Sequence, residues 1–136
     1  MKTKSPGTSA ALDRRIKQLY KLLNQRDFKR CYGLIDPHIR HRATSVTLDQ
    51  YANSLAEFLA HFGSVKVLDI SLDLHLGEPS ALYEGRDFAL GKTIWQDETG
   101  HQHTFSERWV RDEKSWFTRS TGFITPATVA PRRKRA

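Results

Sequence analysis

The sequence predicts an α+β domain in which three N-terminal helices are followed by a mainly antiparallel sheet. Apolar residues recur at a helical period in the segments before Gly63. Directly after Gly63 the period changes to that of a strand. Residues 101–123 then read as two strands joined by a polar turn. The chain therefore divides into a helical part and a sheet part, in that order.

The first two helices are each predicted from one apolar stripe. The first begins at about Ser9, a residue type common at helix N-caps, and its opposite face is basic. Its apolar stripe consists of Leu12, Ile16, Leu19, Tyr20 and Leu23. A shorter helix follows Asp27 and ends at Asp36-Pro37, because the residue before a proline is pushed out of the helical region. The single cysteine, Cys31, lies on the apolar side of this helix, and we interpret it as a small buried hydrophobic residue.

The third helix has the clearest start signal in the chain. Thr47 and Gln50 have the spacing of a capping box, and Gly63 is a typical helix stop. Tyr51 lies on the apolar stripe of this helix, where a tyrosine is more often a core residue than a pocket residue. It is still a candidate to present its hydroxyl group to a pocket. Residues 38–46 are expected to form a polar connection, with or without a short strand, and to have their histidines at the surface.

A long strand is predicted after Gly63, and a second strand is expected to begin near Ala81. The covered face of the long strand consists of alternate apolar residues: Leu68, Ile70, Leu72, Leu74 and Leu76. The second strand turns at residues 97–100 into the final hairpin. If Gln96 pairs with His101, Leu90 lies opposite Glu107, whereas a two-residue slip places Lys92 opposite Glu107. Either register places one set of residues of this strand on the Glu107 face: Phe88, Leu90, Lys92 and Ile94.

The final hairpin is predicted to turn at Asp112-Glu113-Lys114. Pairing Arg111 with Ser115 sets Glu107 directly opposite Arg119, because strand partners step in opposite directions. The face that holds this pair is otherwise mainly aromatic, and it consists of Phe105, Glu107, Trp109, Phe117 and Arg119. The outer face carries three large apolar residues: Trp95, Val110 and Trp116. The acid and arginine are the one constellation in the sequence that we expect to support chemistry.

Length and charge limit the organisation of the chain. With 136 residues the chain is one domain by length. We expect residues 1–8 to be a flexible lead-in, residues 9–124 to be the folded domain and residues 125–136 to be a disordered basic tail. The formal net charge of +7 falls to +1 without six basic residues near the ends: Lys2, Lys4, Arg132, Arg133, Lys134 and Arg135. A basic groove within the folded part is therefore not indicated.

The order of elements resembles the nuclear transport factor 2-like superfamily, which includes ketosteroid isomerase, scytalone dehydratase and polyketide cyclases. The resemblance covers about residues 12–123. It rests on the helix junction Asn24-Gln25-Arg26-Asp27, the Asp36-Pro37 stop and Arg108-Trp109-Val110 before Trp116. It implies a strongly curved sheet wrapped round the helices, a cone-shaped and cystatin-like fold with an apolar pocket. Members share the cone and differ in the residues that line it, so the resemblance implies no catalytic assignment.

The resemblance places the pocket on the Glu107 face of the sheet. The candidate pocket residues are Tyr51, Lys92, Phe105, Trp109, Phe117 and Arg119. Burial disfavours an ionised Glu107, whereas an adjacent arginine favours it. Two interpretations remain open: Glu107 and Arg119 form a structural ion pair, or Arg119 holds a ligand and Glu107 moves a proton. His103, at the mouth of the cone, is the second candidate catalytic residue.

Metal and cofactor sites are not predicted. His101 and His103 share a strand face, but a third ligand at usable spacing is missing from the sequence. Neither a phosphate-binding glycine loop nor a dinucleotide-binding motif is present. No apolar run approaches the roughly 20 residues that cross a bilayer, and the first ten residues lack the apolar segment of a secretory signal. We expect a cytoplasmic protein that does not bind membranes.

Three functions remain open from the sequence. The leading hypothesis is a domain that binds a small apolar molecule in the cone pocket or acts as a dimeric scaffold. The second is an acid/base enzyme of isomerase, dehydratase or cyclase type. The third is nucleic-acid binding through the basic tail, residues 132–135. A homodimer is expected to form through Trp95, Val110 and Trp116, because tryptophans that point away from a core need another surface to cover them.

Overall fold

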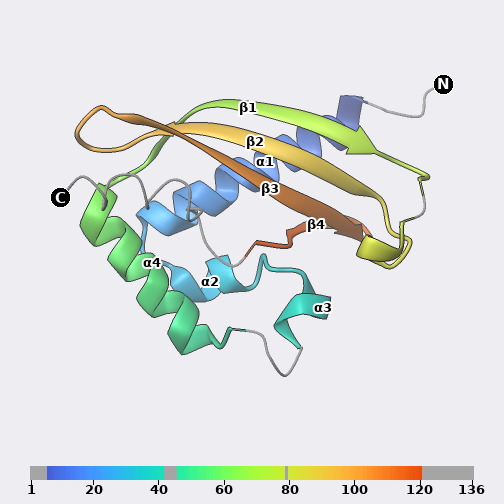
Figure 1. Ribbon diagram of the computed structural model, residues 1–136, viewed down its shortest axis with the longest axis horizontal. Helices are drawn as coiled ribbons and strands as arrows, with labels where there is room; N and C mark the ends of the chain where they lie inside the picture. The colour runs from blue at the N-terminus through green and yellow to red at the C-terminus, as the bar shows by residue number, and fades with distance from the viewer. Residues whose placement is uncertain (1–5, 42–45, 79, 121–136) are drawn as a thin grey trace.

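The computed structural model describes residues 6–41, 46–78 and 80–120 and has an α+β fold, which confirms the predicted class (Figure 1). Helices pack against one face of a curved antiparallel sheet of four strands in the order β1-β2-β3-β4. The strands are β1 (Lys66–His75), β2 (Phe88–Gln96), β3 (Gln102–Asp112) and β4 (Ser115–Thr118). Residues 1–5 of the predicted lead-in and the whole predicted tail lie outside the described residues.

The helical part follows the predicted order with two differences. Helix α1 (Pro6–Asn24) begins before the predicted Ser9, so part of the expected lead-in is helical. Helix α2 (Phe28–Tyr32) is capped by Asp27, as expected. A short helix α3 (Pro37–Arg40) lies where only a polar connection was predicted, because the Asp36 carboxylate accepts a hydrogen bond from the backbone N–H of His38 and caps it. Within the described ranges, no helix has the length and apolar character needed to cross a membrane.

Helix α4 (Leu48–Phe62) has the predicted capping box. The Thr47 hydroxyl accepts a hydrogen bond from the Gln50 backbone N–H at 3.1 Å, and the Gln50 side chain accepts one from the Thr47 backbone N–H at 2.9 Å. The helix ends at Gly63, whose positive φ of 74° suits a residue without a side chain. Its buried stripe includes Tyr51, which is a core residue in this structure.

The sheet differs from the prediction at its first edge and at its first connection. A bulge between Val67 and Asp69 of β1 leaves Leu68 39% exposed, whereas the other predicted apolar residues of this strand pack against the core: Ile70, Leu72, Leu74 and Leu76. The segment Ala81–Tyr83 forms a 3-10 helix, η1, and not the start of a strand. This turn lies at the end of the sheet where β1 passes into β2 (Figure 1).

Both predicted registers around β3 are wrong by one residue. Gln96 pairs with Gln102 and not with His101, so Gly91 and not Leu90 or Lys92 lies opposite Glu107. At the next turn Asp112 pairs with Ser115, which places Thr118 and not Phe117 opposite Trp109. A one-residue shift exchanges the two faces of a strand. The predicted face of β3 is therefore correct, and the predicted faces of β2 and β4 are reversed.

The helix-facing side of the sheet is the core. Trp95 and Trp116, predicted on the outer face, are 1% and 3% exposed and belong to the main hydrophobic cluster with Trp109. Val110 is also fully buried. These three residues are covered within one copy of the chain and do not form the predicted dimer surface. The edge-to-face contacts of Trp95 with Phe58 and with Phe62, at centroid distances of 5.3 and 5.2 Å, attach α4 to the sheet.

Replacing Thr47 by Ala should lower the free energy of unfolding by about 1 kcal/mol, because it removes the hydroxyl acceptor of the capping box. Urea unfolding followed by circular dichroism measures this change. Ser54→Ala, at an exposed position of the same helix, is the matched control and should have little effect. Equal stabilities of the Thr47→Ala variant and the wild type would contradict the assigned cap.

Candidate functional site

Glu107 is the buried carboxyl group on the helix-facing side of the sheet. It lies on β3 between Phe105 and Trp109, which are also buried, and its own residue is 5% exposed. One carboxyl oxygen, Oε2, accepts a hydrogen bond from the Thr118 hydroxyl at 2.8 Å. The other, Oε1, is buried and has no hydrogen-bond partner within the described chain. Buried polar atoms are usually paired, so this oxygen is exceptional.

Burial raises the pKa of Glu107 to about 7, because a charged carboxylate is poorly solvated among apolar residues. The hydrogen bond from Thr118 acts in the opposite direction, as does the nearby Trp109 indole group. The negative charge of Glu107 also contributes to the raised pKa values of Tyr20 and Tyr51, after the larger effect of their own burial. A carboxyl group with a pKa near neutrality can both accept and release a proton under physiological conditions.

Two tryptophan N–H groups on the same side of the sheet are buried polar groups, as the carboxyl group of Glu107 is. The Nε1 atoms of Trp95 and Trp109 are buried and make no hydrogen bond of normal geometry within the described residues, although the Trp109 indole lies close enough to Glu107 to lower its pKa. Trp109 stands two residues from Glu107 on β3, whereas Trp95 pairs with His103 and lies four residues along β2 from Gly91, the partner of Glu107. Glu107 Oε1 and these two N–H groups thus lie buried among aromatic rings on one side of the sheet. We call this set, Glu107, Trp95 and Trp109, the interior polar group.

Several predicted site residues do not join the interior polar group. Lys92 is exposed on the opposite face of the sheet, where it pairs with Ser106. Phe117 and Arg119 also lie away from Glu107, because β4 is shifted by one residue from the predicted register. Of the other predicted pocket residues, Tyr51, Phe105 and Trp109 are buried in the core. The predicted pairing of Glu107 with Arg119 is therefore wrong, and Thr118 takes the place of the arginine.

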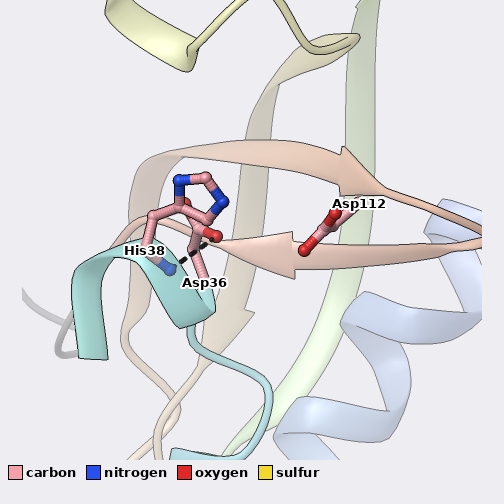
Figure 2. A group of neighbouring side chains, drawn as sticks. All are labelled: Asp36, His38 and Asp112. Carbon is pink, nitrogen blue, oxygen red and sulfur yellow. Dashed lines mark hydrogen bonds between the residues drawn. The ribbon is translucent and has the colours of Figure 1, made fainter. Parts of the chain in front are cut away.

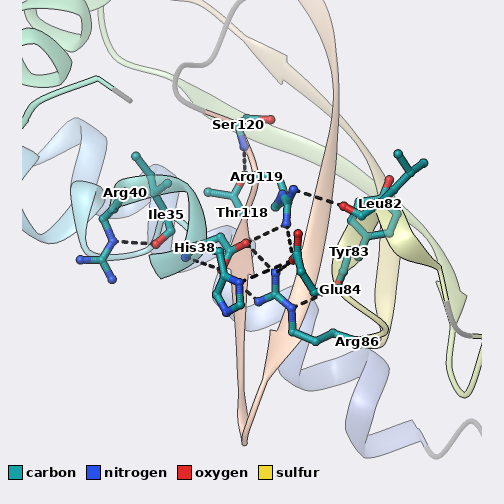
Figure 3. Close-up of polar contacts among 11 residues, drawn as sticks. Ile35, His38, Arg40, Leu82, Tyr83, Glu84, Arg86, Thr118, Arg119 and Ser120 are labelled. Carbon is teal, nitrogen blue, oxygen red and sulfur yellow. Dashed lines mark hydrogen bonds and ion pairs between the residues drawn. The ribbon is translucent and has the colours of Figure 1, made fainter. Parts of the chain in front are cut away.

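Arg119 instead belongs to an ionic cluster that joins α3, η1 and β4 (Figure 3). At its centre is Asp36, whose side chain is fully buried. The Asp36 carboxylate accepts hydrogen bonds from Arg86 Nη1 and Nη2 at 3.0 and 2.9 Å, and from Arg119 Nη1 at 3.0 Å. Glu84 binds both arginines as well. Two acids thus neutralise two arginines.

The ionic cluster is saturated by its own members. Arg86 donates through Nε to the Tyr83 carbonyl oxygen at 3.1 Å, and Arg119 donates through Nη2 to the Leu82 carbonyl oxygen at 3.3 Å. Although burial alone would raise it, the pKa of Asp36 lies below its ordinary value because Arg86 and the His38 backbone donate hydrogen bonds to the carboxylate. The Asp36 backbone N–H also donates to the Thr118 carbonyl oxygen at 2.8 Å. These contacts indicate a structural role.

Asp36, His38 and Asp112 come close enough to be considered as metal ligands (Figure 2). Their nearest ligand atoms lie within 4.8 Å of one another. However, both oxygens of the Asp36 carboxylate already face arginine guanidinium groups, and two positive charges at that distance repel a cation. The chemistry of this group does not fit a metal centre.

His103, the second predicted catalytic residue, pairs with Asp97. The two side chains lie 2.8 Å apart, from Nε2 to Oδ2, and the imidazole stacks on Trp95 at a centroid distance of 4.4 Å. Burial opposes ionisation of Asp97, but hydrogen bonds from the Thr99 and His103 side chains keep its pKa below the ordinary value. His103 and Glu107 are four residues apart on one strand, or roughly 13 Å at 3.3 Å per residue. They do not act on the same atom of a small ligand.

Sequence reasoning missed Thr118 and Asp36. Thr118 lies within the second strand of the predicted hairpin, on the face that the predicted register turned away from Glu107, and only the correct register shows that its hydroxyl reaches Glu107. Asp36 was interpreted only as a helix stop, although an Asp before a proline can also cap the next helix. Its arginine partners are 50 and 83 residues away in the chain, and local sequence carries no signal of such pairs.

Comparisons of this chain with protein-family models, with curated proteins and with solved structures found no match. The functional argument therefore depends on the geometry of the chain itself.

Asp36→Asn should lower the free energy of unfolding by about 3 kcal/mol, because it leaves two half-buried arginines without their central charge. Asparagine caps helices as well as aspartate does, so the cap of α3 is preserved and the loss reports the ionic cluster. Chemical denaturation measures the change. The exposed Asp69→Asn on β1 is the control, with an expected effect below about 0.5 kcal/mol. A similarly small effect of Asp36→Asn would show that the cluster is not stabilising.

Glu107→Gln should remove a pH dependence of stability. The folded-state pKa of about 7 exceeds the ordinary 4.5, so the folded protein binds this proton more tightly than the unfolded chain does. The stability of the wild type therefore falls as the pH rises from 4.5 through 7. The fall corresponds to about 3 kcal/mol for a shift of this size. The variant, neutral at every pH, should lack it.

Urea unfolding of both proteins between pH 4.5 and 8 tests this expectation. Glu57→Gln, at an exposed position of α4, is the control and should follow the wild-type profile. Parallel profiles for the wild type and Glu107→Gln would contradict the interior placement of this carboxyl group.

Proposed function

We propose that the chain is a ligand-binding domain of nuclear transport factor 2-like type, with a cone-shaped interior that takes a small, mainly apolar molecule. The order of helices and strands, the curved antiparallel sheet and the helices on its concave side support this proposal. One observation carries the ligand-binding part: Glu107 Oε1 is buried and makes no hydrogen bond of normal geometry within the described chain, although the Trp109 indole lies close enough to lower the pKa of this carboxyl group. A ligand with a hydroxyl or amide donor would satisfy it.

The surroundings of Glu107 favour a flat, apolar ligand with a single donor group. Phe105 and Trp109 flank the carboxyl group along β3, and Trp95 lies on the next strand. Gly91 stands directly opposite Glu107, and the side chains of Leu72 and Trp109 pack over it. Aromatic walls with a few fixed polar groups are the usual lining of small-molecule sites. Such a lining gives affinity through apolar contact and orientation through the carboxyl group.

The second candidate function is acid/base catalysis by Glu107. The pKa of about 7 favours it, since a group that titrates near neutrality transfers protons efficiently in either direction. In this reaction Glu107 would take a proton from a carbon or oxygen of the bound molecule and return it to another atom, as in an isomerisation. Thr118 would orient the carboxyl group through its hydrogen bond to Oε2. Lys92 and Arg119, on other faces, would not stabilise the resulting anion.

Titration with 2-naphthol, an apolar ring system with one donor, tests ligand binding. Nuclear magnetic resonance of the tryptophan indole N–H groups should show saturable shifts of Trp95 and Trp109. In Glu107→Gln the affinity should fall about tenfold above pH 7 and little below pH 6, because only the ionised carboxylate forms the stronger, charge-assisted bond.

Two controls accompany this titration. 2-Methoxynaphthalene has the same ring system without the donor and should bind more weakly to the wild type above pH 7. Glu57→Gln should bind 2-naphthol as the wild type does. Equal affinities for the two naphthalenes, or no indole shift at all, would contradict a ligand-binding role of Glu107.

A further inference from the structure

The outer face of the sheet, opposite the interior polar group, contains a groove of about 400 Å³. It crosses the middle of β1, β2 and β3, where alternate side chains point away from the helices. Its volume falls within the range of about 300 to 1,000 Å³ that small-molecule sites occupy. Six outward-pointing side chains line it: Ser71, Asp73, Leu90, Lys92, Ser106 and Arg108. We call this feature the outer groove.

Two cations in the outer groove have no partner within the described part of the chain. The side chains of Lys92 and Arg108 make no hydrogen bond or ion pair there, in contrast to Arg86 and Arg119. Lys92 pairs with Ser106 across the β2–β3 ladder, so Arg108 is its diagonal neighbour on the same face, with the Cα atoms roughly 7 to 8 Å apart. Two like charges at this spacing repel each other, and one anionic group between them would relieve the repulsion.

The other residues of the outer groove determine which further chemical groups a ligand can have and how it is oriented. Leu90 is paired with Arg108 and is 40% exposed, so it offers an apolar floor beside the cations. Asp73 lies on the far side of Leu90, on β1, and would repel an anion there. Its carboxylate is held by His75 at 3.0 Å. The anionic end of a ligand would therefore point toward β3 and its apolar part would lie on Leu90.

We propose that the outer groove binds a small organic anion, a phosphate or carboxylate attached to an apolar ring or chain. The charge-assisted hydrogen bonds come from Lys92 and Arg108, and the hydroxyls of Ser71 and Ser106 flank Lys92 as further donors. This site does not depend on the proposed function of Glu107, because the two sets of side chains lie on opposite faces of the same strands.

Phenyl phosphate is the probe that tests the outer groove, with the backbone amides followed by nuclear magnetic resonance. Saturable shifts are expected at Gly91, Lys92 and Arg108. Phenol, which lacks the charge, should cause no saturable shift at these amides, and inorganic phosphate, which lacks the ring, should bind more weakly. Lys92→Ala and Arg108→Ala should each weaken binding about tenfold.

Lys66→Ala is the matched control, since Lys66 is an exposed cation at the far end of β1. It should leave the affinity within about twofold of the wild type. An equal loss in Lys66→Ala and Lys92→Ala would overturn the proposal, because it would show diffuse attraction to a basic surface. Shifts confined to the Trp95 and Trp109 indoles, or no saturation below about 10 mM, would overturn it as well. Unchanged amide spectra of the variants outside the groove would show that they remain folded.

Discussion

The arrangement of both candidate sites depends on the turn between β2 and β3, which sets the register of the central strand pair. Asp97 fixes this turn: its Oδ1 atom accepts hydrogen bonds from the Thr99 backbone, the Thr99 hydroxyl and the His101 backbone. Its backbone N–H donates to the His101 carbonyl oxygen at 2.9 Å. His101 is therefore part of the turn, and pairing starts one residue later, between Gln96 and Gln102. A single side chain thereby decides which residues of β2 face the helices.

The register also explains how three tryptophans fit in one small core. Ala89 lies opposite Trp109, and a side chain at Gly91 would meet the Trp109 ring at 3.6 Å. Small residues on β2 thus leave room for a large ring on β3, which is the interdigitation that dense packing requires. Phe88 and Leu90 of β2 are placed on the other face, whereas the large Trp95 lies on the core face near the end of the strand. Because Leu90 faces outward in this register, it is exposed and forms part of the outer groove.

Helices α1, α2 and α4 and the strand order were predictable because their signals are local, whereas α3 and η1 were not predicted. The capping box of Thr47 and Gln50 and the alternation along β1 each depend on residues only a few positions apart. The faces of β2 were not predictable from hydrophobicity, because the even-numbered residues on one face of the strand are as apolar as the odd-numbered residues on the other. Phe88, Leu90 and Ile94 suggested a core face, whereas Ala89, Gly91 and Thr93 form it. The available signal was Asp97 itself, because an aspartate side chain that accepts hydrogen bonds from the backbone two residues on is typical of a turn.

Glu107 was predicted correctly as an interior residue, but its partner was not, and this difference changes its chemistry. Beside Arg119 the carboxyl group would remain ionised, with a depressed pKa. Thr118 offers one neutral hydrogen bond instead, so burial is the dominant effect and the pKa rises to about 7. The arginine is retained elsewhere by Asp36, a carboxylate that two guanidiniums keep charged. The fold thus gives its buried acids different environments: Asp36 is held ionised as a structural anchor, and Glu107 is left able to exchange a proton.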